Sequence, residues 1–161
     1  MDRSTGSKKK LTPDQARDKA EHYCAYQERS QQEVRDKLYA WGLHQNEVER
    51  IISELIETNF LNESRFAHAY AQGRFKLKAW GKYKIKAGLK SKQVSARLIQ
   101  DALDGIPAEA YQEMLKEVLQ KKARLIRESD VFIRQQKLIQ YGLMRGYERD
   151  LILEILNANT L

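Results

Sequence analysis

A unit of about 50 residues recurs three times along this 161-residue chain. The apolar residues Val34, Leu38, Leu43 and Val48 recur 50 to 51 residues later as Ile85, Leu89, Val94 and Leu98, and 53 residues further on as Leu138, Gly142, Tyr147 and Leu151. A period of this length is typical of stacked supersecondary units, although any helical chain gives some chance matches. Because turns, helix caps and apolar stripes recur together, the pattern favours a true repeat.

Capping residues and breakers divide each copy into three short helices. Ser30 opens a capping box, and Gly42 suits a left-handed cap at the end of the same helix. Asn62 can cap the fourth helix, which Trp80-Gly81 breaks. No segment alternates with period two over more than a few residues, so we expect no sheet. The sequence predicts an all-α chain of about nine helices in three tandem three-helix repeats, at 12–60, 61–105 and 106–161, after a disordered basic tail at 1–11.

The apolar stripes predict which side chains form the core. The fourth helix should bury Tyr70 and Leu77, and the seventh and longest helix should bury Leu125. Trp80 and Trp41 could stack on nucleic-acid bases, but a Trp before a helix-ending Gly is more often a core anchor. The predicted core residues are Val34, Leu38, Ile52, Phe66, Tyr70, Trp80, Ile85, Leu89, Ile99, Leu103, Leu151 and Ile155.

Positive charge is concentrated in the second repeat. The 37 residues from Ser64 to Gln100 hold ten Lys and Arg residues and no Asp or Glu, whereas the whole chain carries a net charge of +7. This asymmetry indicates a polyanionic partner. The alternative is a solvated lysine surface, which would not need to exclude acidic residues over such a length.

Many of these cations flank Trp80-Gly81, where the fourth and fifth helices should meet in a basic corner. Backbone amides at the start of the fifth helix should add partial positive charge there. Such a corner can hold phosphates without reading bases. The candidate binding residues of the basic corner are Arg74, Lys76, Lys78, Lys82, Lys84, Lys86, Lys90 and Lys92.

The sequence has little that indicates catalysis. His22, His44 and His68 fall on separate helices, without an HExxH pair or an acidic partner at ligand spacing. Cys24 is the only cysteine, which excludes a disulfide or a cysteine-based zinc site, and it suits a small core position. We therefore expect a non-enzymatic protein with no metal and no cofactor.

Compartment signals are equally sparse. A lone cysteine suits a reducing compartment. No apolar run approaches the roughly 20 residues that a membrane span requires. The N-terminus lacks the apolar core of a signal peptide. We expect a soluble cytoplasmic protein.

A longer pattern runs through all three repeats. Its central part is Phe60-Leu61-Asn62-Glu63, Arg65-Phe66-Ala67, Tyr70, Trp80-Gly81, Lys84-Ile85, Leu89, Val94, Ile99 and Ala102-Leu103. Its outer parts are Ser30, Glu33, Val34, Leu38, Gly42 and Ile52, and then Arg145-Gly146-Tyr147 and Asp150-Leu151-Ile152. Over about residues 15–157 this pattern resembles the RecX family of regulatory proteins. Gln93 departs from it, since relatives usually have Gly at that turn.

The resemblance implies a curved, elongated array of repeats that regulates the RecA recombinase. Such proteins lodge in the groove of the RecA–single-stranded DNA filament and inhibit its growth, ATP hydrolysis and strand exchange, and so modulate homologous recombination, DNA repair and the SOS response. The implied partners are this filament and single-stranded or double-stranded DNA, bound by a monomer. Two alternatives stay open at this stage: a stand-alone helix-turn-helix DNA-binding protein, and a protein–protein adaptor for which the lysines would be idle.

Overall fold

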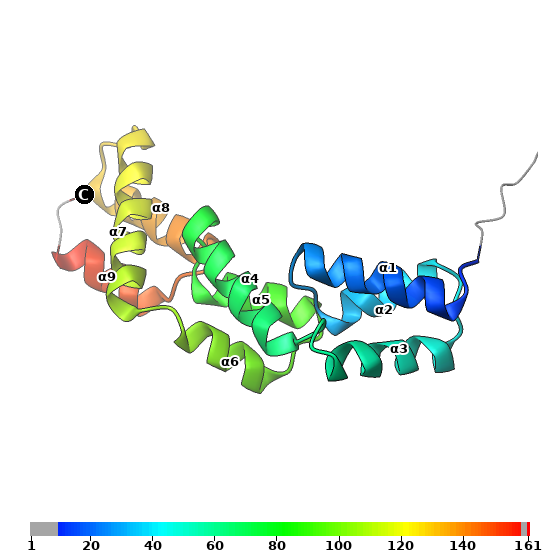
Figure 1. Cartoon of the computed structure of the whole chain (residues 1–161). Coiled ribbons are helices and arrows are strands. Elements are labelled where there is room, and N and C mark those ends of the chain that lie inside the picture. Colours follow the sequence, from blue (N-terminus) through cyan, green and yellow to red (C-terminus); the bar gives the residue numbers. More distant parts are fainter. Residues whose placement is uncertain (1–9, 159–160) are drawn as a thin grey trace, which may run out of the picture. The chain divides into compact units, whose positions relative to one another are not determined.

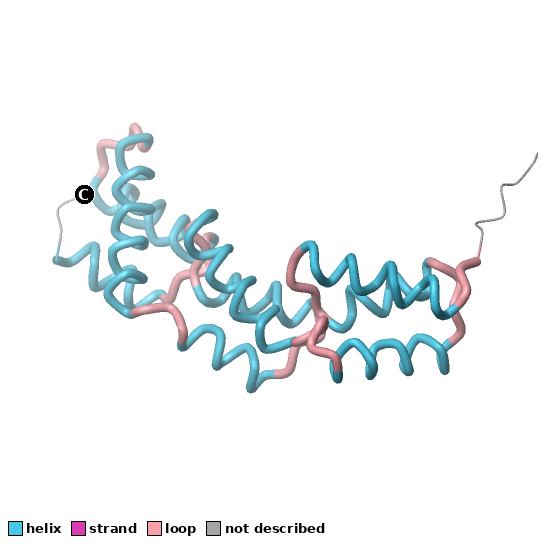
Figure 2. The backbone as a smooth tube through the Cα atoms, viewed as in Figure 1, coloured by secondary structure: helices cyan, strands magenta, loops and turns pink. Residues whose placement is uncertain are grey.

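The computed structural model describes residues 10–158 and 161, and this part of the chain contains helices and turns but no strand (Figures 1 and 2). Its nine helices are α1 (Pro13–Tyr26), α2 (Gln31–Ala40), α3 (Gln45–Glu57), α4 (Glu63–Lys78), α5 (Lys82–Ser91), α6 (Ala96–Asp104), α7 (Ala108–Leu125), α8 (Val131–Met144) and α9 (Arg149–Ala158). The all-α prediction is confirmed. The chain forms two compact units, and the boundary between them falls after Phe66.

Most of the predicted tail at 1–11 lies outside the described residues. Its last residue, Leu11, donates a backbone hydrogen bond to the carbonyl of Trp41 (3.2 Å) and packs against the core of the first unit. Thr12 then caps α1 by accepting from the amide of Gln15 (3.2 Å), and Pro13 occupies the first helical position. Leu11 therefore belongs to the folded first unit, and the unit begins just before α1.

The first unit buries one stripe from each of its first three helices. Val34 and Leu38 of α2 are fully buried, and Ile52 of α3 is almost so. Ser30 is also fully buried, and its hydroxyl accepts a hydrogen bond from the amide of Glu33 (3.0 Å), which caps α2 and offsets the cost of burying a polar group. In Figure 1 these helices run from blue to teal.

The same turn ends the second helix of every repeat. Its left-handed residue is Gly42, Gln93 or Gly146, with φ of 90°, 60° and 97°. The amide of the residue that follows it donates to the carbonyl five positions earlier in each repeat. The pairs are Leu43 with Leu38 (3.3 Å), Val94 with Leu89 (3.2 Å) and Tyr147 with Gly142 (3.0 Å). These are Schellman motifs, so the predicted repeat is confirmed at the level of the backbone.

The third helix of each repeat buries its fourth residue. These residues are Val48 in α3, Ile99 in α6 and Ile152 in α9. The predicted matches Leu98 and Leu151 are each one position too early, and both are only half-buried. Ile155 is also half-buried, whereas Leu156 is buried. Because α9 is apolar on several sides, its spacing alone does not select a face, and the start of the helix sets the register.

Other predicted core positions differ in the fourth and seventh helices. The predicted residues Val34, Leu38, Ile52, Phe66, Ile85, Leu89, Ile99 and Leu103 are buried. The core face of α4 consists of Phe66, Ala67, Ala71 and Phe75, so Tyr70 is half-buried and Leu77 is 86% exposed. Leu125, at the end of α7, is 74% exposed. The alanines form a weaker apolar signal than Tyr70 and Leu77, which is why the sequence suggested the wrong face.

Candidate nucleic-acid interface

The basic corner lies in the second unit, where α4 ends and α5 begins. Ala79 adopts a left-handed conformation (φ 53°), and its amide bonds to the carbonyl of Phe75 (3.0 Å), which ends α4. The amide of Trp80 bonds to the carbonyl of Arg74 (3.1 Å). Gly81 then caps α5 with an extended backbone. The chain thus turns over three residues, and the basic ends of two helices become neighbours.

The corner is fixed to the turn at Gly146 in the last repeat. The amide of Gly81 donates to the carbonyl of Arg145 (2.8 Å), and the amide of Tyr83 donates to that of Gly146 (2.9 Å). A Cβ on Gly81 would lie 2.2 Å from the carbonyl carbon of Gly146. Only glycine fits there, because two backbones pack directly against each other.

Arg145 and Tyr147 complete this contact between the second and third repeats. Arg145 Nη2 donates to the carbonyls of Lys78 and Ala79, and the Tyr147 hydroxyl donates to that of Ala79 (2.9 Å). Carbonyls at the end of α4 have no partner within the helix, so these side chains supply one. Arg145 was not among the residues predicted for the corner. Its only signal was the Arg145-Gly146-Tyr147 match to the family pattern.

The backbone amides of Gly81, Lys82 and Tyr83 at the start of α5 are bonded within the protein. Besides Gly81 and Tyr83, the amide of Lys82 donates to the Tyr111 hydroxyl (2.9 Å), which in turn donates to Glu148 Oε1 (2.6 Å). Burial raises the pKa of the Tyr111 phenol, and the bond to Glu148 raises it further, so the hydroxyl stays protonated. These three amides therefore already have acceptors within the protein, and the sequence alone did not reveal those acceptors.

Three cations of the corner gather on the ring of Trp80. Lys84 Nζ lies 4.7 Å from the ring centroid, Lys78 Nζ lies 5.9 Å away, and the Arg74 guanidinium carbon lies 5.4 Å away. Arg74 also lies 4.5 Å from the centroid of Tyr70. Trp80 is half-buried. It is a platform for cations rather than a core anchor, and these cations compete with bases for its faces.

The other cations are more dispersed. Lys82 Nζ lies 5.0 Å from the centroid of Tyr111, and Lys82 and Lys86 line a small cavity of about 190 Å³ with the exposed Tyr83. Lys90 and Lys92 are at the other end of α5, roughly 12–15 Å along the helix from Lys82. The structure thus brings Arg74, Lys78 and Lys84 together at Trp80, and Lys82 and Lys86 together at this separate cavity. The exposed Lys76 and Lys90 and the half-buried Lys92 do not line this cavity.

Cys24 and His44 occupy structural positions. Cys24 is buried in the first unit, and burial raises the pKa of its thiol to about 11. His44 precedes α3 and its amide donates to Glu47 Oε2 (3.4 Å). Within the described ranges, no three His, Cys, Asp or Glu residues are grouped as a metal site, and no helix is long and apolar enough to span a membrane.

Three family models match successive parts of the chain. The first three-helix domain of RecX matches residues 16–55, the second matches residues 62–103, and the third matches residues 109–156. Each match covers parts of three consecutive helices of the structure, α1–α3, α4–α6 and α7–α9.

Individual relatives agree with the family models. Regulatory protein RecX of Clostridium perfringens (strain 13) is 33% identical over 124 residues, which cover 76% of this chain and 58% of the relative. The protein of the same name from Clostridium acetobutylicum is 35% identical over 132 residues, 80% of this chain and 61% of the relative. The chain thus matches about three fifths of the length of these relatives. The crystal structure of RecX from Lactobacillus salivarius superimposes with a TM-score of 0.83 and 25% identity, over 91% of this chain and 95% of that one.

Proposed function

Because this chain belongs to the RecX family of regulatory proteins, we propose that it regulates the RecA recombinase. In this proposal it binds in the groove of the RecA–single-stranded DNA filament and inhibits filament growth, ATP hydrolysis and strand exchange. It thereby modulates homologous recombination and DNA repair, as a monomer in the cytoplasm. The observation that carries the proposal beyond the family name is the basic corner, where three cations gather on Trp80 and the backbone is bonded to the last repeat.

The chemistry of the corner favours phosphates over base edges. Its cations are on side chains, and its helix-start amides are already bonded to Arg145, Gly146 and Tyr111. Contacts of cations with phosphates position a protein on nucleic acid without reading sequence. We therefore expect little preference among DNA sequences, in contrast to a helix-turn-helix repressor, which discriminates by about 1–3 kcal/mol at each key base. The same surface suits double-stranded DNA or the acidic surface of a protein filament.

The test is DNA-dependent ATP hydrolysis by RecA on single-stranded DNA, with this protein titrated at fixed DNA excess. We expect inhibition well below one molecule per RecA monomer, because the target is the filament. Inhibition only at amounts that coat the DNA would indicate competition for the strand. Tight DNA binding with no inhibition would contradict the proposal and favour the stand-alone DNA-binding protein.

A charge-reversed variant tests the role of the corner. Lys82→Glu combined with Lys84→Glu should weaken filament and DNA binding without unfolding the protein, because neither side chain is buried. The matched control is Lys116→Glu with Lys121→Glu on α7, which changes the net charge equally away from the corner. Equal loss of inhibition in both variants would remove the corner from the mechanism and leave only net charge.

A further inference from the structure

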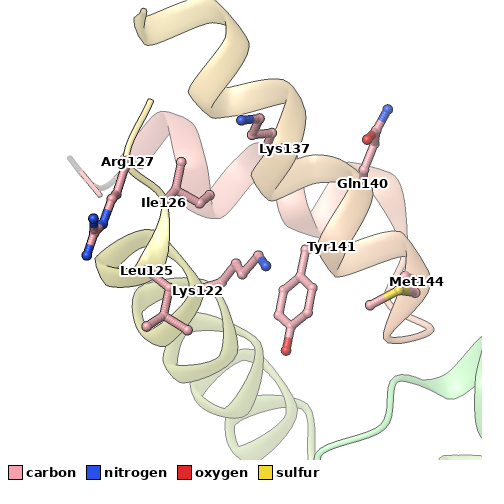
Figure 3. Close-up of a pocket in the computed structure, with 8 residues that line it drawn as sticks. All are labelled: Lys122, Leu125, Ile126, Arg127, Lys137, Gln140, Tyr141 and Met144. Carbon is pink, nitrogen blue, oxygen red and sulfur yellow. The ribbon is translucent and has the colours of Figure 1, made fainter. Parts of the chain in front are cut away.

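A second cationic surface lies between α7 and α8 of the last repeat, and it shares no lining residue with the basic corner (Figure 3). Its cavity has a volume of about 460 Å³. In Figure 3, Lys122 of α7 and Tyr141 of α8 extend into the space between the two helices. The Lys122 Nζ atom lies 4.9 Å from the centroid of the Tyr141 ring. The lining of the cavity therefore includes a cation held on an aromatic face.

All the charged side chains that line this cavity are positive. Lys122, Arg127 and Lys137 contribute three cations, and none of the described lining residues carries a carboxylate. Glu128 approaches Lys137 Nζ at 4.0 Å, but both side chains are partly exposed to solvent. An exposed pair at this distance is weak, so Lys137 stays available to a stronger anionic partner. The cavity should therefore attract an anionic group.

The same cavity exposes aliphatic surface. Leu125 is 74% exposed and Met144 is 64% exposed, and both line it. Methionine and other flexible apolar side chains beside cations are typical of surfaces that bind protein segments. Single-stranded nucleic acid instead stacks its bases on open aromatic faces. Tyr141 is the one aromatic side chain in the described lining, and Lys122 already covers it.

We propose that the α7–α8 cavity binds an acidic peptide segment that carries a large aliphatic side chain. Carboxylates of the segment pair with Lys122, Arg127 and Lys137, while its aliphatic side chain contacts Leu125 and Met144. Charge complementarity brings such a segment to the surface, and the apolar contact distinguishes it from other anions. This site depends neither on the basic corner nor on the proposed action on RecA.

The probe is a fluorescein-labelled peptide of Asp and Glu with two leucines one helical turn apart, measured by fluorescence anisotropy. Screening beyond about 8 Å at physiological salt limits long-range charge effects. We expect Lys122→Glu to weaken binding at least tenfold and Leu125→Ser to weaken it about fivefold, which correspond to roughly 1.4 and 1 kcal/mol. Lys121→Glu, which changes the charge equally at an exposed residue outside the lining, should change the affinity less than about twofold.

Three outcomes would overturn the proposal. Equal weakening by Lys121→Glu and Lys122→Glu would reduce the effect to general attraction. Equal binding of the peptide with both leucines replaced by serine would leave the aliphatic contact without a role. Tighter, Lys122-dependent binding of an oligothymidylate of the same charge would assign the cavity to nucleic acid. Met144→Ser, checked like the others by thermal unfolding, serves as a second apolar variant because Met144 is exposed.

Discussion

Three described residues with a Cβ adopt the left-handed conformation, namely Asn59, Ala79 and Gln93. This conformation costs about 1–2 kcal/mol for most residues, because the Cβ crowds the backbone. Asn tolerates it best, but Ala and Gln have no such advantage. Both lie just after the end of a helix, Ala79 after α4 at the basic corner and Gln93 after α5.

Gln93→Gly should therefore stabilise the protein by about 0.5–1 kcal/mol, because relief of the left-handed strain exceeds the extra entropy of glycine in the unfolded chain. Urea unfolding measures the change. Gln112→Gly is the matched control, since Gln112 is exposed within α7. The control should destabilise by about 1 kcal/mol. Destabilisation by Gln93→Gly would mean that the strain is absent.

Cys24 should be unreactive in the folded protein. Burial raises the pKa of its thiol from 9.0 to about 11, which lowers the thiolate fraction near pH 8 about hundredfold. Ellman's reagent should react slowly in buffer and rapidly in guanidinium chloride. Because the folded-state pKa is the higher one, ionisation of Cys24 should lower the free energy of unfolding only as pH rises from about 9 to about 11. Rapid reaction in buffer would show that the thiol is exposed.

At the scale of helices, one face of α5 packs in the core and the rest of its surface carries cations. Ile85 and Leu89 are fully buried, whereas Tyr83 is 63% exposed and lies among lysines. Neighbouring residues on a helix point about 100° apart, so a stripe of apolar residues four apart leaves the rest of the surface to cations. The helix can therefore carry the corner's charge without placing any of it in the core.

Ile85→Ala should destabilise the protein by about 2–5 kcal/mol, through lost burial and the cavity that remains. Tyr83→Ala should change the stability by no more than about 0.5 kcal/mol, because its side chain is exposed. Thermal or urea unfolding distinguishes them. Equal effects of the two substitutions would show that the buried face of α5 is elsewhere.

Caps and turns were predictable from the sequence because a single residue determines each of them. Ser30, Gly42 and Asn62 act as expected: two accept hydrogen bonds from helix-start amides, and Gly42 is left-handed. Buried faces were harder to predict. The buried face of α4 contains alanines, which are only weakly apolar. The helix α9 has apolar residues on several sides, so the spacing does not single out the buried one. The exposed Leu125 is the last residue of α7, which is longer than its counterparts α1 and α4. The helical spacing of apolar residues in α7 therefore continues beyond the part of the helix that contacts the core.

At the scale of the whole molecule, the distribution of positive charge along the chain can be read from the sequence, because folding does not change which residues are charged. The acid-free segment from Ser64 to Gln100 carries ten cations in a chain of net charge +7. The concentration of charge at Trp80 was foreseen. The loss of the α5 amides to internal bonds was not, because it depends on Arg145, Gly146 and Tyr111, which lie far along the chain.

Affinity for single-stranded DNA should fall as salt rises, with little dependence on base sequence. Each phosphate contact contributes about 0.7 to the slope of log affinity against log salt concentration. Replacing both Lys82 and Lys84 by Glu should then reduce the slope by about 1.4 or more, if each contacts one phosphate. Anisotropy titrations on homopolymers at several salt concentrations measure it. An unchanged slope would mean that neither lysine contacts a phosphate.

The bonded amides of Gly81, Lys82 and Tyr83 have a consequence for hydrogen exchange. The first amides of a helix normally exchange quickly, because they have no partner within the helix. Here the acceptors belong to Arg145, Tyr111 and Gly146 of the last repeat. Their exchange rates therefore measure how often the second and third repeats separate, rather than how often α5 unfolds. These three amides are a built-in reporter of whether a partner holds the two repeats together or draws them apart.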